Sequence, residues 1–143
     1  MQPLVFGSRA KLSLADAKLI IDAAEKKAAE LGVDMNIAVV DESGNLIAFV
    51  RMDGARITDV EAAINKASAA VTAGGRFGPG GGMDVRGISS MNADAGSKGL
   101  PIRVRGHIVG AVGCSSGTQD EEYAVARAGV EAFIKTLRRS PQE

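Results

Sequence analysis

The sequence predicts an α+β protein, a three-layer α/β/α sandwich on a mainly antiparallel sheet of four to five strands. Two pairs of apolar runs, each joined by a short polar turn, predict two β-hairpins, and strands joined by tight turns are antiparallel. Three segments with helical spacing of apolar residues predict amphipathic helices. Because the strand runs are apolar on both faces, helices are expected on both sides of the sheet. The expected order is α-β-β-α-loop-β-β-α.

The first half of the chain predicts one helix and one hairpin. Ser13 precedes an apolar series over Leu14–Leu31, and Gly32 follows it, so this helix is expected to have a cap at each end. The apolar runs Ile37–Val40 and Leu46–Val50 then flank five turn-forming residues, which predicts the first hairpin.

The middle of the chain predicts a second helix and a loop. Thr58–Glu61 has the pattern of a capping box, and the helix that it opens is expected to end at the glycine-rich segment Gly74–Gly82. A short helical turn is expected over Asp84–Met91. This loop has no Gly-Lys-Ser/Thr sequence and is therefore not a Walker A motif.

The last third predicts a hairpin followed by a helix. Pro101–Val104 and His107–Ser115 flank the turn Arg105-Gly106, and Thr118–Glu121 caps the final helix.

Composition limits the functions to consider. The 143 residues form one expected domain, 1–143, and 17 basic residues balance 17 acidic ones. Because of this charge balance, neither a nucleic-acid nor a membrane partner is expected, and aromatic residues at 3% also argue against base stacking. A single cysteine and a single histidine leave no metal cluster and no internal disulfide. No signal peptide or membrane-spanning run is recognisable, so a cytoplasmic protein is expected.

Polar residues at the end of the first hairpin predict the site. Arg51 and Asp53 leave a strand just before Gly54, and Lys66 lies on the following helix, whose neighbouring positions are alanines. Arginines can hold a carboxylate, and a carboxylate or an amine can transfer a proton. The expected catalytic residues are Asp53 and Lys66. The expected ligand-binding residues are Arg51, Arg76, Gly80, Gly81, Asp84 and Arg103.

Each of these features also has a simpler, non-functional interpretation. The glycine-rich loop can be a flexible surface loop or an oligomer contact, and the charged residues can be surface ion pairs. His107 is interpreted as a solvated residue at a strand start. Cys114 is interpreted as a small buried residue on the strand face that it would share with Ile108, Gly110 and Val112.

Several motifs resemble the GlcG/HbpS family of haem-binding or haem-degrading domains, which is related to the C-terminal domain of propanediol-utilisation cobalamin adenosyltransferases. The matching segments are Ile37–Asp41 with Gly44 and Leu46, Arg51–Ala55, Lys66-Ala67, Gly99–Ile102 with Gly106, Val109–Gly113, and Asp120. The chain departs from the family pattern over Gly74–Asn92. The resemblance implies a profilin-like fold and a homo-oligomer. It leaves the cofactor unknown, with haem or a corrinoid implied by the resemblance but not supported by His107.

Three functions follow from these observations. The first is a protein that binds a small molecule, either an anionic metabolite or a tetrapyrrole, in a catabolic pathway. The second is an enzyme that isomerises or hydrates a small oxo- or hydroxy-carboxylate by proton transfer. The third is a structural subunit of an oligomer.

Overall fold

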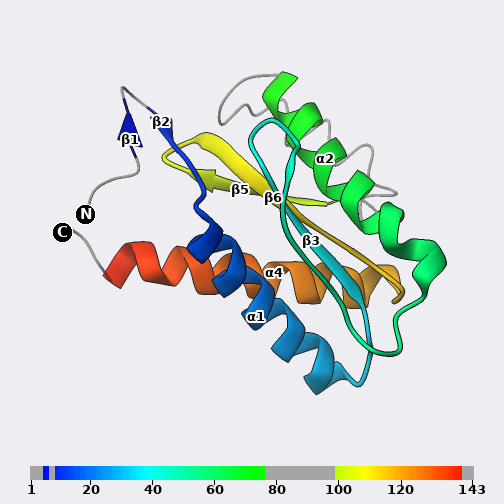
Figure 1. Ribbon diagram of the computed structural model, residues 1–143. Helices are drawn as coiled ribbons and strands as arrows, with labels where there is room; N and C mark the ends of the chain where they lie inside the picture. Colours follow the sequence, from blue (N-terminus) through cyan, green and yellow to red (C-terminus); the bar gives the residue numbers. More distant parts are fainter. Residues whose placement is uncertain (1–4, 7–8, 77–98, 140–143) are drawn as a thin grey trace.

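A four-stranded antiparallel sheet forms the centre of the protein (Figure 1). The computed structural model describes residues 5–6, 9–76 and 99–139. The sheet has the order β4-β3-β6-β5. Its strands are β3 (Asn36–Asp41), β4 (Leu46–Arg51), β5 (Leu100–Val104) and β6 (His107–Ser115). The two hairpins are therefore joined side by side through β3 and β6, which lie in the middle, while β4 and β5 form the edges.

Three helices cover the sheet on both faces, as the sequence predicts (Figure 1). Helix α2 (Val60–Arg76) packs on one face, mainly over β6 and β3. Helices α1 (Leu14–Leu31) and α4 (Gln119–Arg139) pack against each other on the other face. The predicted three-layer α+β sandwich is confirmed.

Two of the three helices begin with the N-terminal cap that the sequence predicts. Ser13 and Asp16 form a capping box at α1, and Gly32 ends that helix with a φ of 77°. Thr118 and Glu121 exchange the same pair of bonds at α4. At α2 the expected capping box is wrong, because Ile57–Asp59 forms a 3-10 turn and the α-helix begins at Val60.

Other boundaries also differ from expectation. Helix α2 continues through the first glycines of the glycine-rich segment to Arg76. A short pair of strands, β1 (Val5–Phe6) and β2 (Arg9–Ala10), was not expected. The rest of the glycine-rich loop and the turn expected over Asp84–Met91 lie outside the described residues.

A β-bulge overturns one prediction about strand faces. In the β5–β6 hairpin the register shifts after Ile102, so that Val109 is an extra residue on β6. Ile108 therefore packs with Ala111 and α2, whereas Cys114 packs in the core on the α1 and α4 side. The expected shared face of Ile108 and Cys114 is wrong, because an extra residue reverses the alternation of side chains.

Close contact between α2 and β6 depends on Gly113. A Cβ atom at this position would lie 2.2 Å from the carbonyl oxygen of Ala63 and 2.6 Å from the nitrogen of Ala67. The missing side chain thus lets the helix backbone rest on the strand, which fixes the height of Lys66 above the end of β6.

Candidate functional site

Polar residues from three strands gather at one end of the sheet. Arg51 pairs with Asn36, and Asn36 pairs with Ser115, so the end of β4, the start of β3 and the end of β6 form one row. Arg51 is exposed and Asn36 is fully buried. Because the strands are spaced about 4.8 Å apart, the backbones of Arg51 and Ser115 are about 10 Å apart.

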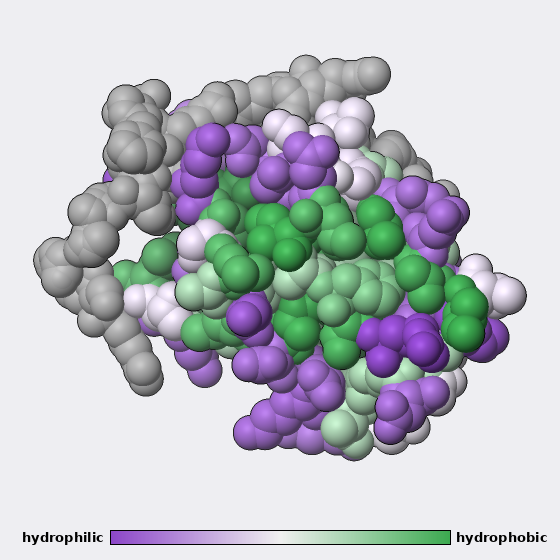
Figure 2. Space-filling view, viewed as in Figure 1, coloured by the Kyte–Doolittle hydropathy of each residue, from purple (hydrophilic) through white to green (hydrophobic). Residues whose placement is uncertain are grey.

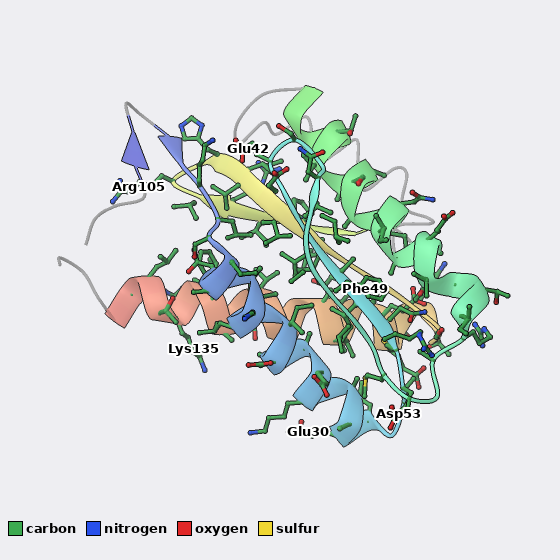
Figure 3. The ribbon with its side chains drawn as sticks, viewed as in Figure 1. Glu30, Glu42, Phe49, Asp53, Arg105 and Lys135 are labelled. Atoms are coloured by element: carbon green, nitrogen blue, oxygen red, sulfur yellow. The ribbon has the colours of Figure 1, made fainter. Side chains whose placement is uncertain are left out.

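The turn after β4 holds Asp53 at this same end. The Gly54 N–H donates to Asp34 Oδ2 at 2.5 Å, and Ala55 N–H donates to the carbonyl of Met52 at 3.0 Å. Asp53 itself is exposed. Figure 3 shows Asp53 and Glu42 at opposite ends of the β3–β4 hairpin.

A network of hydrogen bonds surrounds Ser116, directly after β6. Its hydroxyl accepts from the backbone N–H of Arg56 at 3.2 Å and lies 3.3 Å from Asp59 Oδ2. Asn36 Nδ2 donates to the carbonyl of Arg56 at 3.0 Å and to Ser115 Oγ at 3.1 Å. Ser115 Oγ donates in turn to the carbonyl of Asp59 at 2.7 Å. These five residues are called the Ser116 network below, and they join the 3-10 turn to the end of the sheet.

Two features of the Ser116 network are unusual for a purely structural contact. Ser116 has a φ of 86°, a left-handed conformation that a residue with a side chain seldom adopts. Asn36 Oδ1 is buried and has no hydrogen-bond partner among the described atoms. Buried polar atoms are nearly always paired with protein groups or water, and backbone strain concentrates at functional sites.

Lys66 forms a largely buried ion pair next to this network. Its ammonium lies 2.9 Å from Glu122 Oε1 and 3.0 Å from the carbonyl oxygen of Cys114. The side chains of Lys66 and Glu122 are 20% and 8% exposed. The other carboxylate oxygen of Glu122 accepts from Gly117 N–H at 3.3 Å. Lys66 thus connects α2, the end of β6 and the start of α4.

The Cys114 thiol lies in the core, as its simpler interpretation predicts. It is 3% exposed. Burial, and to a lesser extent the nearby carboxylate of Glu122, raise the pKa of this thiol to about 12 against the opposing charge of Lys66. A thiol with this pKa is not a nucleophile near neutral pH.

The structure separates the other predicted site residues from this end. Arg103 pairs with Ile108, which is seven residues before Ser115 on β6, or about 23 Å away along the strand. Helix α2 also runs towards that far end, because Ala70 and Val71 pack with Ala111 and Ile108. Arg76 ends the helix there. Gly80, Gly81 and Asp84 lie outside the described residues.

One chain therefore brings together part of the predicted site. Arg51, Asp53 and Lys66 lie at one end of the sheet, and Arg103 lies at the other, so the arginine clamp does not form within a subunit. Their roles in binding or catalysis stay predictions. His107 is exposed at the start of β6, at the far end. Among the described residues, no group of three or more His, Cys, Asp and Glu is placed to hold a metal ion.

Sequence reasoning missed Asn36, Glu122 and the contacts of Ser116. Asn36 carried a signal, because a polar residue directly before a buried strand run must find hydrogen-bond partners. Glu122 is one of three acidic residues in the first turn of α4. The sequence does not show which of these three acidic residues pairs with Lys66, because each of them could simply complement the helix dipole.

Comparison with known proteins finds a matching family model and a relative of similar sequence. Residues 12–131 match the family model described as haem-degrading protein HbpS-like. An uncharacterised 15.0 kDa protein from the dhaT-dhaS intergenic region of Citrobacter freundii is 32% identical over 136 residues, which cover 87% of this chain and 93% of that protein.

Solved structures share the fold over nearly the whole chain. Klebsiella pneumoniae ORFY matches with a TM-score of 0.71 and 24% identity, covering 93% of this chain and 98% of that one. A complex of PduOC with haem matches with a TM-score of 0.67 and 20% identity, covering 86% and 95%. A double mutant of Streptomyces reticuli HbpS matches with a TM-score of 0.65 and 25% identity, covering 92% and 96%. Among the described helices, none is long and apolar enough to cross a membrane.

Proposed function

This chain belongs to the family of HbpS-like haem-degrading proteins, and from that premise we propose that it binds a small molecule carrying carboxylate groups. The two candidate sources of this chemistry are a tetrapyrrole such as haem, which has two propionates, and an anionic metabolite. We place the site at the end of the sheet formed by Arg51, Asp53, Lys66 and the Ser116 network. Arg51 is the residue expected to contact a carboxylate, because its guanidinium is charged, exposed and able to bind both oxygens.

The observation that carries the proposal is the left-handed backbone of Ser116 inside a partly buried network. Such a conformation costs about 1–3 kcal/mol in a residue other than glycine and persists where surrounding contacts impose it. Here the contacts come from Arg56, Asp59 and Asn36. Asn36 Oδ1 adds a buried acceptor that a ligand N–H or O–H, or a water bound with it, would satisfy.

The residues at this end fit the carboxylates of a tetrapyrrole better than its iron. Common iron ligands are His, Cys, Met and Tyr. The single histidine lies at the far end, and the Cys114 thiol is in the core. The sulfur of Met52 accepts the N–H of Met35 at 3.3 Å. We therefore assign to this end the contact with propionate.

Binding measurements with matched variants test the proposal. Haem, cobalamin and a panel of small oxo- and hydroxy-dicarboxylates are titrated separately into the wild type, Arg51→Ala and the control Arg127→Ala. Arg127 is exposed on α4 and pairs with Glu131, away from the site. Loss of a charge-assisted contact should weaken binding roughly ten- to a hundredfold in Arg51→Ala alone, since such contacts contribute about 1.5–3 kcal/mol. Equal affinities in all three proteins would overturn the site.

A second candidate, proton transfer on an oxo- or hydroxy-carboxylate, is favoured by the Lys66–Glu122 pair. A shielded amine and carboxylate, together with an exposed Asp53 at the same end of the sheet, provide groups that can accept and donate protons. Proton NMR of the same panel in D₂O tests it. Loss of the signal of a hydrogen next to a carbonyl in the presence of protein, and its retention with Asp53→Asn, would establish this chemistry. Retention of every such signal with the wild type would exclude it for that panel.

A further inference from the structure

Strand β4 is an apolar edge strand whose outer side has no neighbour in the described sheet. Its sequence, Leu46 to Arg51, contains no proline and no lysine, the residues with which proteins usually protect an edge. Leu46 is 47% exposed, and the four residues after it are half-buried. Figure 2 shows apolar side chains gathered on this face of the molecule, between α1 and α2, where β4 runs.

The hydrogen-bond pattern shows which backbone groups point to the open side. Met52 N–H donates to the carbonyl of Met35 at 3.1 Å, which continues the β3–β4 register by one pair. Bonded and non-bonded pairs alternate in an antiparallel ladder, so the Ile37–Val50 pair is bonded to β3 and the two pairs beside it are not. The N–H and C=O groups of Phe49 and Arg51 therefore point away from the sheet.

Side chains on the α2 side of β4 extend this surface. Ala48 and Val50 pack towards the core on the α1 side, so Phe49 and Arg51 lie on the opposite face by alternation. Helix α2 packs mainly over β6 and β3, and Phe49 remains half-buried next to an exposed Arg51. Figure 3 places Phe49 midway along the hairpin.

We propose that β4 pairs antiparallel with β4 of a second copy of this chain, about a two-fold axis at Val50. Two four-stranded sheets then become one continuous sheet. In this register Phe49 and the partner's Arg51 exchange two backbone hydrogen bonds, and symmetry repeats them. The interface also uses only the regular part of the strand, because the bulge between β3 and β4 lies nearer the turn, at Ile47.

We infer that the partner of the β4 edge is a second copy of this chain, because this surface is complementary to itself. The two-fold axis sets the guanidinium of each Arg51 against the ring of the partner's Phe49, and a cation is attracted to an aromatic face. On the other face the two Val50 side chains meet. A two-fold contact needs both halves of each interaction on one patch, and β4 has a donor, an acceptor, a cation and a ring within three residues.

Arg51 belongs both to this interface and to the ligand site of the proposed function. The proposed ligand site would then border the two-fold axis, with one copy of the site on each side of it. The two ideas fail separately, because assembly is measured without ligand and with variants that retain Arg51.

Cross-linking through a single introduced cysteine is the first test. Val50→Cys should give a disulfide dimer under mild oxidation on a non-reducing gel, because the Cα atoms of a non-bonded pair are about 4.5 Å apart, within disulfide range. The native Cys114 is buried and should not react. Ile57→Cys is the control, since Ile57 is 67% exposed but lies off the strand. Dimer formation by Val50→Cys alone supports the proposal, and equal cross-linking of both variants or of neither overturns it.

Sedimentation of backbone variants is the second test. Phe49→Pro removes an N–H that points outward and spares the bonds to β3, whereas Phe49→Ala removes only the ring. The wild type should sediment as a dimer, or as an assembly built from dimers, at micromolar concentration. Phe49→Pro should raise the dissociation constant at least tenfold more than Phe49→Ala. A wild type that is monomeric at 100 µM, or a folded Phe49→Pro that sediments like the wild type, would overturn the pairing. If Phe49→Pro does not fold, the cross-link decides.

Discussion

The ammonium of Lys66 lies 3.0 Å from the carbonyl oxygen of Cys114, on the side of β6 that β5 does not reach. Strand β5 pairs with β6 as far as Val112, and the alternation of the ladder turns the carbonyl of Cys114 to that open side. Lys66 therefore takes the place of a missing strand N–H. The same ammonium binds Glu122 at the start of α4, so one side chain links the two helical layers around the edge of the sheet.

Removing the amine should destabilise the protein strongly. Lys66→Met keeps much of the side-chain length but leaves the carboxylate of Glu122 largely buried without its cation. We expect the free energy of unfolding in urea to fall by about 3–5 kcal/mol, as it does when one partner of a buried ion pair is lost.

A double variant distinguishes the loss of the Lys66–Glu122 ion pair from the loss of side-chain packing. Lys66→Met combined with Glu122→Leu removes both charges, so it should be more stable than Lys66→Met alone. If the two single changes simply add, the pair contributes no coupling and the architectural role of Lys66 is wrong.

Cys114 should be inert in the native protein and should make stability depend on alkaline pH. With the pKa of its thiol raised to about 12, from an ordinary value of 9.0, the folded state disfavours the thiolate. The stability due to the protonated thiol is present below pH 9 and is lost as pH rises from 9 towards 12, by up to about 1.4 kcal/mol per pH unit. Urea unfolding at pH 8 and pH 10 should show a steeper loss in the wild type than in Cys114→Ala.

Reagent access provides an independent measurement. Native protein at pH 8 should react with a disulfide reagent far more slowly than protein in denaturant. Rapid labelling of folded protein would contradict the burial of Cys114.

The sequence predicted those parts of the fold that depend on local signals. Ser13 and Gly32 bracket α1 as expected, and the positive φ values of Arg105 and Gly106 form the tight turn predicted for the second hairpin. The pairing of β3 with β6 has no local signal, because Asn36 and Ser115 are 79 residues apart. That pairing decides which polar residues meet.

In the candidate site too, local sequence signals predict some features, and long-range strand pairing sets the others. Arg51 and Asp53 lie together because a few residues of one chain segment separate them. The distance between Arg51 and Arg103 depends on strand order and direction, and the antiparallel arrangement puts the two at opposite ends. The face of Ile108 was wrongly predicted because a single extra residue at Val109, invisible in the apolar pattern, shifts the alternation.

Ser116 should tolerate glycine better than alanine. Both variants lose the hydroxyl contacts with Arg56 and Asp59, but glycine adopts a φ of 86° without steric cost. We expect Ser116→Ala to be about 1 kcal/mol less stable than Ser116→Gly in urea unfolding, with Ser116→Gly still below the wild type. Equal stability of the two variants would mean that the left-handed backbone is not imposed by the fold.

If haem binds, its binding should not require His107. The imidazole is exposed beside the tip of the β5–β6 hairpin, eight residues before Ser115 on the same strand and so about 26 Å from the polar end. This distance keeps the imidazole out of the proposed site. Haem titrated into His107→Ala should therefore give the Soret maximum and affinity of the wild type, whereas Arg51→Ala should bind at least tenfold more weakly. Loss of the Soret band in His107→Ala, with Arg51→Ala unaffected, would move the haem site to the hairpin and leave the polar end to another ligand.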